Sequence, residues 1–283
     1  MKVIRRSQAL KKTLQLFKNK NKRVGFVPTM GYLHEGHLSL VRRARRENDV
    51  VVASIFVNPL QFGPKEDFAR YPRDLKRDTQ MLKDEKIDAL FVPDARRLYT
   101  EHFQTSVSVG HLSRPLCGTA RPAHFSGVAT VVLKLLNLVA PDTLYLGQKD
   151  YQQFRVIEQM VRDLDMPTEV RLCPIIREKD GLAMSSRNYY LDAEERMQAS
   201  SLNRALGLAE DLIRRGVKNA EKLKGIMRKE LSAASRAKID YAEIVDAESL
   251  SPVVQLKKGQ KVELALAVYF SKTRLIDNRL IRV

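Results

Sequence analysis

The sequence has no apolar run long enough to cross a bilayer as a helix, which takes about 18 residues. Its longest run, VVVASIFV at 50–57, is rich in β-branched residues and predicts a buried strand. The first residues, MKVIRRSQALKK, are basic but no apolar segment follows them, so we expect no signal peptide. The two cysteines, Cys117 and Cys173, have neither CxxC nor metal-ligand spacing, which suits a reducing compartment. These absences predict a cytoplasmic protein.

Acidic side chains are scarce relative to basic ones. The 33 Asp and Glu residues stand against 50 Lys and Arg, which gives a formal net charge of +17. Such a charge suits a nucleic-acid binder, a site for phosphorylated ligands or a basic solvated surface. The basic residues run from Lys2 to Arg282, interleaved with acidic ones, so we favour the solvated surface. The charge alone names no partner.

The first part of the chain alternates apolar runs with segments of helical period. This alternation predicts βαβ units in a doubly wound, parallel, Rossmann-like α/β sheet. We expect strands at 24–27, 50–57, 88–92, 143–147 and 169–176, and helices at 35–46, 74–86, 127–140 and 151–164. In such sheets ligands bind beyond the carboxyl ends of the strands, where the loops lead into the helices.

The pattern changes after Ile176. Long polar helical stretches at 192–215 and 219–237 lead into alternating runs such as KVELALAVYF at 261–270. This change predicts two domains, a nucleotide- and substrate-binding domain at 1–176 and a smaller α+β domain at 177–283. We expect the smaller domain to have an antiparallel sheet and to close over the site.

The loop PTMGYLHEGH, residues 28–37, follows the first long strand. His34 and His37 are three residues apart at the expected start of a helix, so their side chains lie on one side of that start. Free backbone N–H groups there favour phosphate, and the two imidazoles can donate hydrogen bonds to it. Zinc is disfavoured, because HExxH needs an i, i+4 pair and a third ligand. A pair of buried, hydrogen-bonded histidines remains the structural alternative.

Two further loops follow strands in the same way. NPLQFG at 58–63 offers Gln61, whose amide can bind hydroxyl and carboxylate groups, although an ordinary Asn-Pro turn is an alternative. GQKDYQQ at 147–153 offers Lys149 for phosphate and Asp150 for ribose hydroxyls, with Gln153 one turn further on. Its alternative is a helix capped by Asp150 beside a solvated lysine.

The fourth loop, REKDGLAMSSRN at 177–188, carries two hydroxyls and a guanidinium in succession. Ser185, Ser186 and Arg187 therefore make a candidate phosphate clamp on a glycine-containing loop. A polar interdomain connector is the alternative. The occurrence of all four loops at strand ends favours one shared ligand site.

These segments resemble the signatures of the pantothenate synthetase (pantoate–β-alanine ligase) family. The resemblance rests, in that family's order, on PTMGYLHEGH, FVNPLQFG with YPRD, RPAHFSGVATVVLKLLNLVAPD, GQKDYQQ and DGLAMSSRN. The family belongs to a nucleotidyltransferase group that includes class I aminoacyl-tRNA synthetases. Its HxGH signature corresponds to His34–His37, and MSSRN resembles a diverged KMSKS signature. The resemblance implies that pantoate reacts with ATP to give pantoyl adenylate and pyrophosphate, and that β-alanine then gives pantothenate and AMP.

The resemblance also implies roles for individual residues. The catalytic groups would be His34, His37 and Lys149, with His37 as proton donor, while Gln61 and Gln153 would hold pantoate and Gln61 would also lie near β-alanine. The residues implied to bind ATP are Met30, Gly31, Tyr32, Leu33, His34, Glu35, Gly36, His37, Gly147, Gln148, Lys149, Asp150, Ile176, Met184, Ser185, Ser186 and Arg187. Gln148 departs from the family, in which Glu is more usual at this position.

The implied partners are small molecules. ATP is a substrate, and Mg²⁺ would be held mainly by its phosphates, with no metal-binding residues of the protein. We expect a homodimer and no nucleic-acid or membrane partner. Asp78 could support the metal from a distance, but a carboxylate on the helix surface is the favoured interpretation. We also expect His124 and Tyr71 to support the pantoate pocket.

Two other functions remain open at this point. One is another ATP-dependent nucleotidyltransferase, such as an adenylyltransferase or a tRNA-charging fragment, although residues 177–283 contain no recognisable anticodon-binding domain. The other is a basic nucleic-acid-binding protein without enzymatic activity, whose binding would weaken strongly with salt. It gives no reason for four coincident loops.

Overall fold

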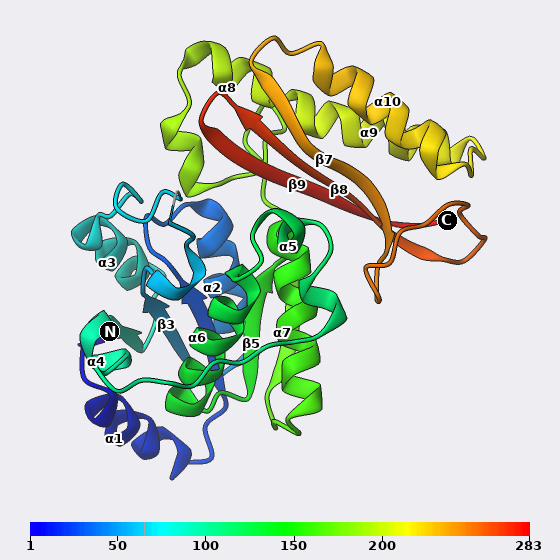
Figure 1. Cartoon of the computed structure of the whole chain (residues 1–283). Helices are drawn as coiled ribbons and strands as arrows, with labels where there is room; N and C mark the ends of the chain where they lie inside the picture. The colour runs from blue at the N-terminus through cyan, green and yellow to red at the C-terminus, as the bar shows by residue number, and fades with distance from the viewer. Residues whose placement is uncertain (65) are drawn as a thin grey trace.

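The computed structural model describes residues 1–64 and 66–283, which form two sheets (Figure 1). The first has six parallel strands in the order β1-β4-β3-β2-β5-β6, and the second has three antiparallel strands in the order β7-β8-β9. The prediction of a doubly wound parallel sheet with a smaller α+β part is therefore confirmed.

The parallel sheet is covered on both faces because its strands are apolar throughout. All six residues of β3 are buried, and they alternate between two cores. Val50 and Val52 pack in the core with α1, α6 and α7, whereas Val51 and Ala53 pack in the core with α2 and α3. The strands and helices of this part are β1 Lys2–Ile4, α1 Ser7–Lys18, β2 Val24–Thr29, α2 Glu35–Glu47, β3 Val50–Ile55, α3 Leu75–Asp84, β4 Ala89–Phe91, α4 Ala95–Leu98, α5 Cys117–Ala120, α6 His124–Val139, β5 Thr143–Gly147, α7 Tyr151–Asp163 and β6 Glu169–Cys173.

The predicted strands and helices of this part are all present, and most differences lie at their ends. The strand predicted at 169–176 ends at Cys173, and the helix predicted at 74–86 spans only Leu75–Asp84. The first strand and helix, β1 and α1, were not predicted. β1 has three residues and pairs with β4, which is far away in sequence. In α1 the buried Leu10 and Leu14 have helical spacing, but the lysines around them obscure the pattern.

The C-terminal part packs two long helices on one face of its sheet. Residues of β8 alternate, so Val262 and Leu264 face the core shared with α9 and α10, while Ala265 belongs to the core of the parallel sheet. Figure 1 shows α9 and α10 on the side of this sheet that faces away from the parallel one. The predicted stretch 192–215 is divided at Ser200 into two helices. The elements are α8 Ala193–Ala199, α9 Ser201–Arg214, α10 Ala220–Ser232, β7 Ala237–Asp246, β8 Lys261–Phe270 and β9 Thr273–Arg282.

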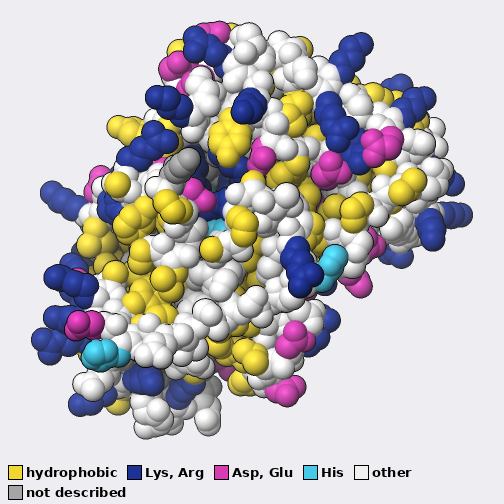
Figure 2. Space-filling model, viewed as in Figure 1, with side chains coloured by type: hydrophobic (Ala, Val, Ile, Leu, Met, Phe, Trp, Pro, Cys, Tyr) yellow, Lys and Arg dark blue, Asp and Glu magenta, His cyan; other side chains and the backbone are white. Residues whose placement is uncertain are grey.

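The basic residues that give the net positive charge are spread over the surface, as the sequence indicated. Figure 2 shows Lys and Arg side chains spread over the visible face with Asp and Glu between them. Many of the basic residues are paired, as in Arg43–Glu47 and Arg204–Glu230. Throughout residues 1–64 and 66–283, no helix combines the length and the apolar character that a membrane span requires.

Candidate active site

A cavity of about 840 Å³ opens at the carboxyl ends of the parallel strands. Its walls come from all four predicted loops and, in addition, from strand β9 of the C-terminal sheet. This is the edge of a parallel sheet at which ligands bind in doubly wound folds. The predicted residues that line the cavity are Met30, His34, Gly36, His37, Gln61, Gly147, Lys149, Asp150, Gln153, Ile176, Met184, Ser185, Ser186 and Arg187.

The two histidines form the N-terminal cap of α2. His34 Nδ1 accepts the backbone N–H of Gly36 at 3.1 Å, and His37 Nδ1 accepts the backbone N–H of His34 at 3.3 Å. A neutral imidazole that accepts at Nδ1 carries its proton on Nε2. The cap therefore gives both rings the same tautomer, with an N–H donor at the far side of each ring. Gly36 leaves room for this arrangement, because a Cβ atom there would lie 2.9 Å from two atoms of the His34 ring.

Both imidazoles are neutral near pH 7. Burial, followed by the positive charge of Lys149, lowers the pKa of His34 to about 4. Burial also lowers the pKa of His37 well below its ordinary value, with His34 and Lys149 as further causes. The ring centroids are 4.1 Å apart, so the site contains two adjacent neutral N–H donors beside a lysine.

Asp78, on α3, holds the backbone of the histidine loop. The prediction that it is a carboxylate on the helix surface is therefore wrong. Its side chain is 1% exposed and accepts the backbone N–H groups of Tyr32 at 2.7 Å and Leu33 at 2.8 Å. Burial raises the pKa of Asp78, although the two N–H donors act in the opposite direction. The residue therefore fixes the turn that leads to the histidines.

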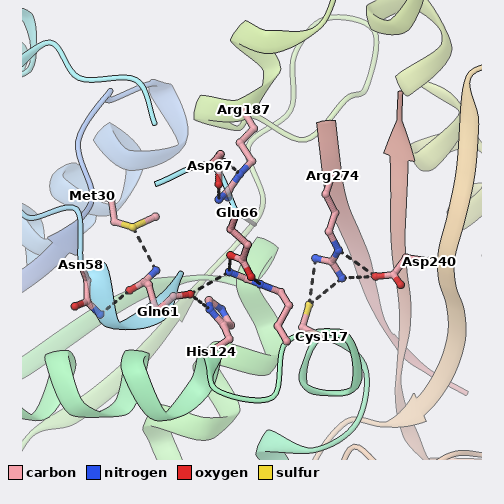
Figure 3. A network of polar contacts seen from close by, with 11 residues as sticks. Met30, Asn58, Gln61, Glu66, Asp67, Cys117, His124, Arg187, Asp240 and Arg274 are labelled. Carbon is pink, nitrogen blue, oxygen red and sulfur yellow. Dashed lines mark hydrogen bonds and ion pairs between the residues drawn. The ribbon is translucent and has the colours of Figure 1, made fainter. Parts of the chain in front are cut away.

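Gln61 is held on three sides (Figure 3). Its Oε1 accepts from Asn58 at 3.1 Å, its Nε2 lies 3.3 Å from the sulfur of Met30, and its backbone carbonyl accepts from His124 Nδ1 at 2.9 Å. Burial, followed by the charge of Arg121, lowers the pKa of His124 to about 4. These contacts join the second loop to the first loop and to the start of α6.

The third loop forms a single 3₁₀ turn, η3 Gln148–Asp150, between β5 and α7. Lys149 Nζ lies 3.5 Å from both carboxylate oxygens of Asp150, at the long end of hydrogen-bond distance. It lines the same cavity as both histidines, and its charge is one cause of their lowered pKa values. Gln153 follows one turn later and is half-buried at the cavity wall.

In the fourth loop the predicted phosphate clamp is engaged with the protein itself. Arg187 makes a bidentate ion pair with Asp67, 2.9 Å on each side, and lies over the Tyr71 ring. Burial alone would raise the pKa of Asp67, but the Arg187 guanidinium holds it below its usual range. Ser186 donates to the carbonyl of Tyr32 at 3.1 Å, which joins this loop to the histidine loop. Arg187 keeps Nη1 outside its pair with Asp67.

Five residues implied to bind ATP lie outside the described lining of the cavity. Leu33 is buried in the core of α2 and α3, Tyr32 packs edge-on against Tyr189, and Glu35 pairs with Arg42. Gly31 forms the turn with φ of 83°, and Gln148 points to β9, where its amide donates to Asn278 at 3.2 Å. These residues shape the loops from behind.

Several polar residues of the cavity were not predicted from the sequence. Arg121 pairs with Glu66 and also donates to the carbonyl of Gln61 at 3.2 Å. Asn58 and Arg121 lie inside two of the quoted family segments, so a signal for them was present. Asp67 and the β9 residues had no such signal. Among the described residues, no group of three His, Cys, Asp or Glu side chains is suited to hold a metal ion.

Comparisons with known proteins agree on one family. The family model of pantoate-beta-alanine ligase matches residues 2–280. The pantothenate synthetases of Thermotoga petrophila and Thermotoga neapolitana are each 55% identical over 281 residues, which cover 99% of this chain and 100% of each relative. The crystal structure of pantothenate synthetase from Thermus thermophilus has a TM-score of 0.93 at 46% identity and covers 99% of both chains.

A further solved structure was determined with ligands. It is the pantoate-beta-alanine ligase of Francisella tularensis complexed with beta-gamma ATP and beta-alanine. Its TM-score is 0.81 at 36% identity, over 99% of this chain and 97% of that one. The fold, the site and these similarities define a ligase built on a Rossmann-like sheet. The chain belongs to the pantoate-beta-alanine ligase family, and both the family resemblance and the prediction of an enzyme are confirmed.

Proposed function

We propose that this enzyme joins pantoate to β-alanine at the expense of ATP, through a pantoyl-adenylate intermediate. The observation that carries the proposal is the capped pair His34 and His37, which presents two Nε2–H donors beside Lys149. The similarity to a relative solved with beta-gamma ATP and beta-alanine supports the choice of substrates.

In the first step a pantoate carboxylate oxygen attacks the α-phosphorus of ATP. A bond forms between that oxygen and phosphorus, and the bond to the bridging oxygen breaks, so pyrophosphate leaves with the negative charge. Preorganised donors stabilise charge that develops in a transition state. We assign this role to the Nε2–H groups of His34 and His37 and to the ammonium of Lys149, with His37 nearest the reacting phosphate.

The remaining predicted nucleotide residues complete the ATP site. Asp150 accepts from ribose hydroxyls, Ile176 lies along the adenine, and Met184, Ser185 and Ser186 border the phosphates. Arg187 reaches the phosphates with its Nη1 group or by exchanging Asp67 for phosphate. The turn residues Gly31–Leu33, Glu35 and Gln148 act by shaping the loops.

Pantoate is a hydroxy acid with two methyl groups on one carbon. Such a molecule needs both amide groups and an apolar wall, and the cavity is lined by Gln61 and Gln153 as well as by Val131 and Val132. In the second step the amine of β-alanine attacks the carbonyl of the adenylate near Gln61. The C–N bond forms, the bond between the carbonyl carbon and the AMP phosphate oxygen breaks, and the proton lost by the amine passes to water while AMP leaves with the bonding electrons.

Mg²⁺ enters this proposal on the ATP phosphates, where it would neutralise part of their charge. The carboxylates of the cavity suit an ion that arrives bound to ATP and is not held by the protein itself. Asp67 and Asp150 line the cavity, but each is already paired with a cation of the protein.

The proposal is tested by incubating the enzyme with ATP, pantoate and β-alanine and measuring AMP, pyrophosphate and pantothenate together. We expect the three products in equal amounts. Pantoate alone should support exchange of labelled pyrophosphate into ATP, because adenylate formation needs no amine. Formation of ADP and phosphate instead would contradict the adenylate. Pyrophosphate release with a different acid, and none with pantoate, would favour another nucleotidyltransferase.

The same proposal extends to the domains, the oligomeric state and the cellular location of the enzyme. We propose that residues 177–283 act as a separate domain that closes over residues 1–176, that the enzyme is a homodimer and that it works in the cytoplasm. Light scattering of the purified protein tests the dimer, and small-angle scattering with and without ATP and pantoate tests the closure.

A further inference from the structure

We infer that two consecutive residues of β9, Asp277 and Asn278, are positioning residues that hold the third and fourth loops of the nucleotide site in register. This inference rests on the proposed function, since it concerns how the ATP site is assembled. Neither residue belongs to a segment from which the family resemblance was drawn.

Asn278 binds the backbone of the turn that carries Lys149. Its Nδ2 group donates to the carbonyl of Gln148 at 2.9 Å and to the carbonyl of Lys149 at 3.0 Å. Its Oδ1 atom accepts from the Gln148 side chain at 3.2 Å, so all the polar atoms of the amide are used. The side chain is 3% exposed and comes from 130 residues further along the chain. A single buried amide therefore fixes the peptide units on both sides of the Lys149 Cα atom.

Asp277 holds the loop that leads to Ser185, Ser186 and Arg187. Its carboxylate makes a bidentate ion pair with Arg177, at 2.6 and 2.9 Å, and its side chain is fully buried. Arg177 in turn donates to the carbonyl of Gly181 at 3.0 Å, inside the same loop. Arg177 directly follows Ile176, the residue proposed to lie along the adenine.

The alternation of a β-strand explains how neighbours can reach both loops. Consecutive side chains of a strand point to opposite faces of the sheet. Asn278 lies opposite Ala265, on the face toward the parallel sheet, while Asp277 lies opposite Leu266, on the face toward α9 and α10. The two residues are also joined, because the backbone N–H of Asn278 donates to Asp277 at 2.8 Å. β9 is one of the two edge strands of its sheet, beside the loops that it contacts.

The contacts of Asn278 fix the backbone of the turn that carries Lys149. The turn at 148–150 is a single 3₁₀ turn, and its N-cap position is Gly147, which has no side chain to cap it. Without Asn278 the peptide units around Lys149 lose two donors, so the lysine loses its fixed direction toward His34 and His37. Small displacements of a positioned group lower rates strongly, by about 100-fold for 1 Å.

The test uses Asn278→Ala and Asn278→Asp in the full-length enzyme. The second substitution keeps the size of the side chain but replaces the donating amide with an acceptor, so both variants should lose the contact to the two carbonyls. We expect the Kd for ATP, measured by calorimetry, to rise roughly ten-fold in each. The rate of pantoate-dependent pyrophosphate exchange should fall further, and the KM for β-alanine should stay within about two-fold.

A double-mutant cycle separates positioning from general stability. If Asn278 acts through Lys149, Asn278→Ala should cost little once Lys149 has been replaced by Ala. Asn219→Ala is the matched control, because it removes the cap of α10, 2.8 Å from the Lys222 N–H, in the same part of the chain but away from the cavity. It should lower stability without changing the Kd for ATP.

The outcomes are distinct for the two proposals. An unchanged Kd for ATP in Asn278→Ala, or full additivity with Lys149→Ala, overturns the inference. If the wild type binds ATP but forms no pantothenate, the proposed function fails while the Kd measurements still decide the role of Asn278. If the wild type binds no ATP, both proposals fail.

Discussion

His37 offers the site one ring nitrogen, because its other nitrogen is used to cap α2. A residue that donates through Nε2 should be replaced best by glutamine, whose amide reaches a similar distance. We expect His37→Ala to lower the rate of adenylate formation by about 100- to 1,000-fold, as for loss of a preorganised donor. His37→Gln should recover part of that loss. Pantoate-dependent pyrophosphate exchange measures both.

The control for this prediction is His102→Ala, which removes an exposed histidine outside the cavity. Its exchange rate should equal that of the wild type. Near-normal exchange in His37→Ala would make His37 a structural cap only. At this scale the sequence indicated the residue types of the site, since His34 and His37 lie at a helix start. It did not predict their shared tautomer, which depends on backbone N–H groups in the folded loop.

At the scale of elements, α3 supports the histidine loop through Asp78. Asp78→Ala leaves two backbone N–H groups without their acceptor, and an unsatisfied buried donor costs about 1–3 kcal/mol. We expect the free energy of unfolding to fall by roughly 2 kcal/mol or more. The Kd for ATP should rise as well, because the turn carrying the histidines loosens. Urea unfolding and calorimetry measure the two effects.

Asp84→Ala is the control on the same helix, because the Asp84 carboxylate accepts an exposed side-chain hydrogen bond from Gln80 at 2.8 Å. Equal unfolding curves for the two variants would contradict the role of Asp78. The sequence alone suggested a surface position because the helix is charged along its whole length. Only the packing of residues 30–33 against α3 reveals that one of these carboxylates is buried.

At the scale of the whole molecule, the part of the site that is built from loops of the parallel sheet could be predicted from the sequence. The part that is contributed by β9 could not. Strands of a parallel sheet end at one edge, so loops such as 147–150 and 58–63 had to meet there. The contribution of Asn278 depends on antiparallel pairing and on how a second sheet packs over the first. No local pattern in the residues around it specifies a partner 130 residues away.

Buried titratable groups make the stability of the whole molecule depend on pH in two opposite ways. The pKa values of His34 and His124 are lowered to about 4, and that of His37 is lowered too, so below pH 6.5 the unfolded chain binds more protons. Stability should therefore fall as the pH drops from 6.5. Burial raises the pKa of Glu263 to about 8 from an ordinary 4.5, so here the folded chain binds more protons.

Glu263 should make the protein less stable as the pH rises from 4.5 to about 8, an effect that the histidines outweigh below pH 6.5. The carboxyl lies on β8, 2% exposed, and its Oε2 atom has no hydrogen-bond partner among the described residues. Tyr151 and Tyr241 lie near it, and burial raises their pKa values too. We therefore expect stability to be greatest near pH 6.5.

Urea unfolding of the wild type from pH 5 to 8.5 should trace this maximum, with a loss on the order of 2 kcal/mol between pH 6.5 and 8. Glu263→Gln keeps the size of the side chain but cannot ionise. On the acidic side its curve should fall more steeply than that of the wild type, because Glu263 no longer offsets the histidines, and above pH 6.5 it should stay level. Parallel curves for the two proteins above pH 6.5 would contradict this prediction. They would mean that Glu263 is already ionised in the folded protein, at its buried position on β8.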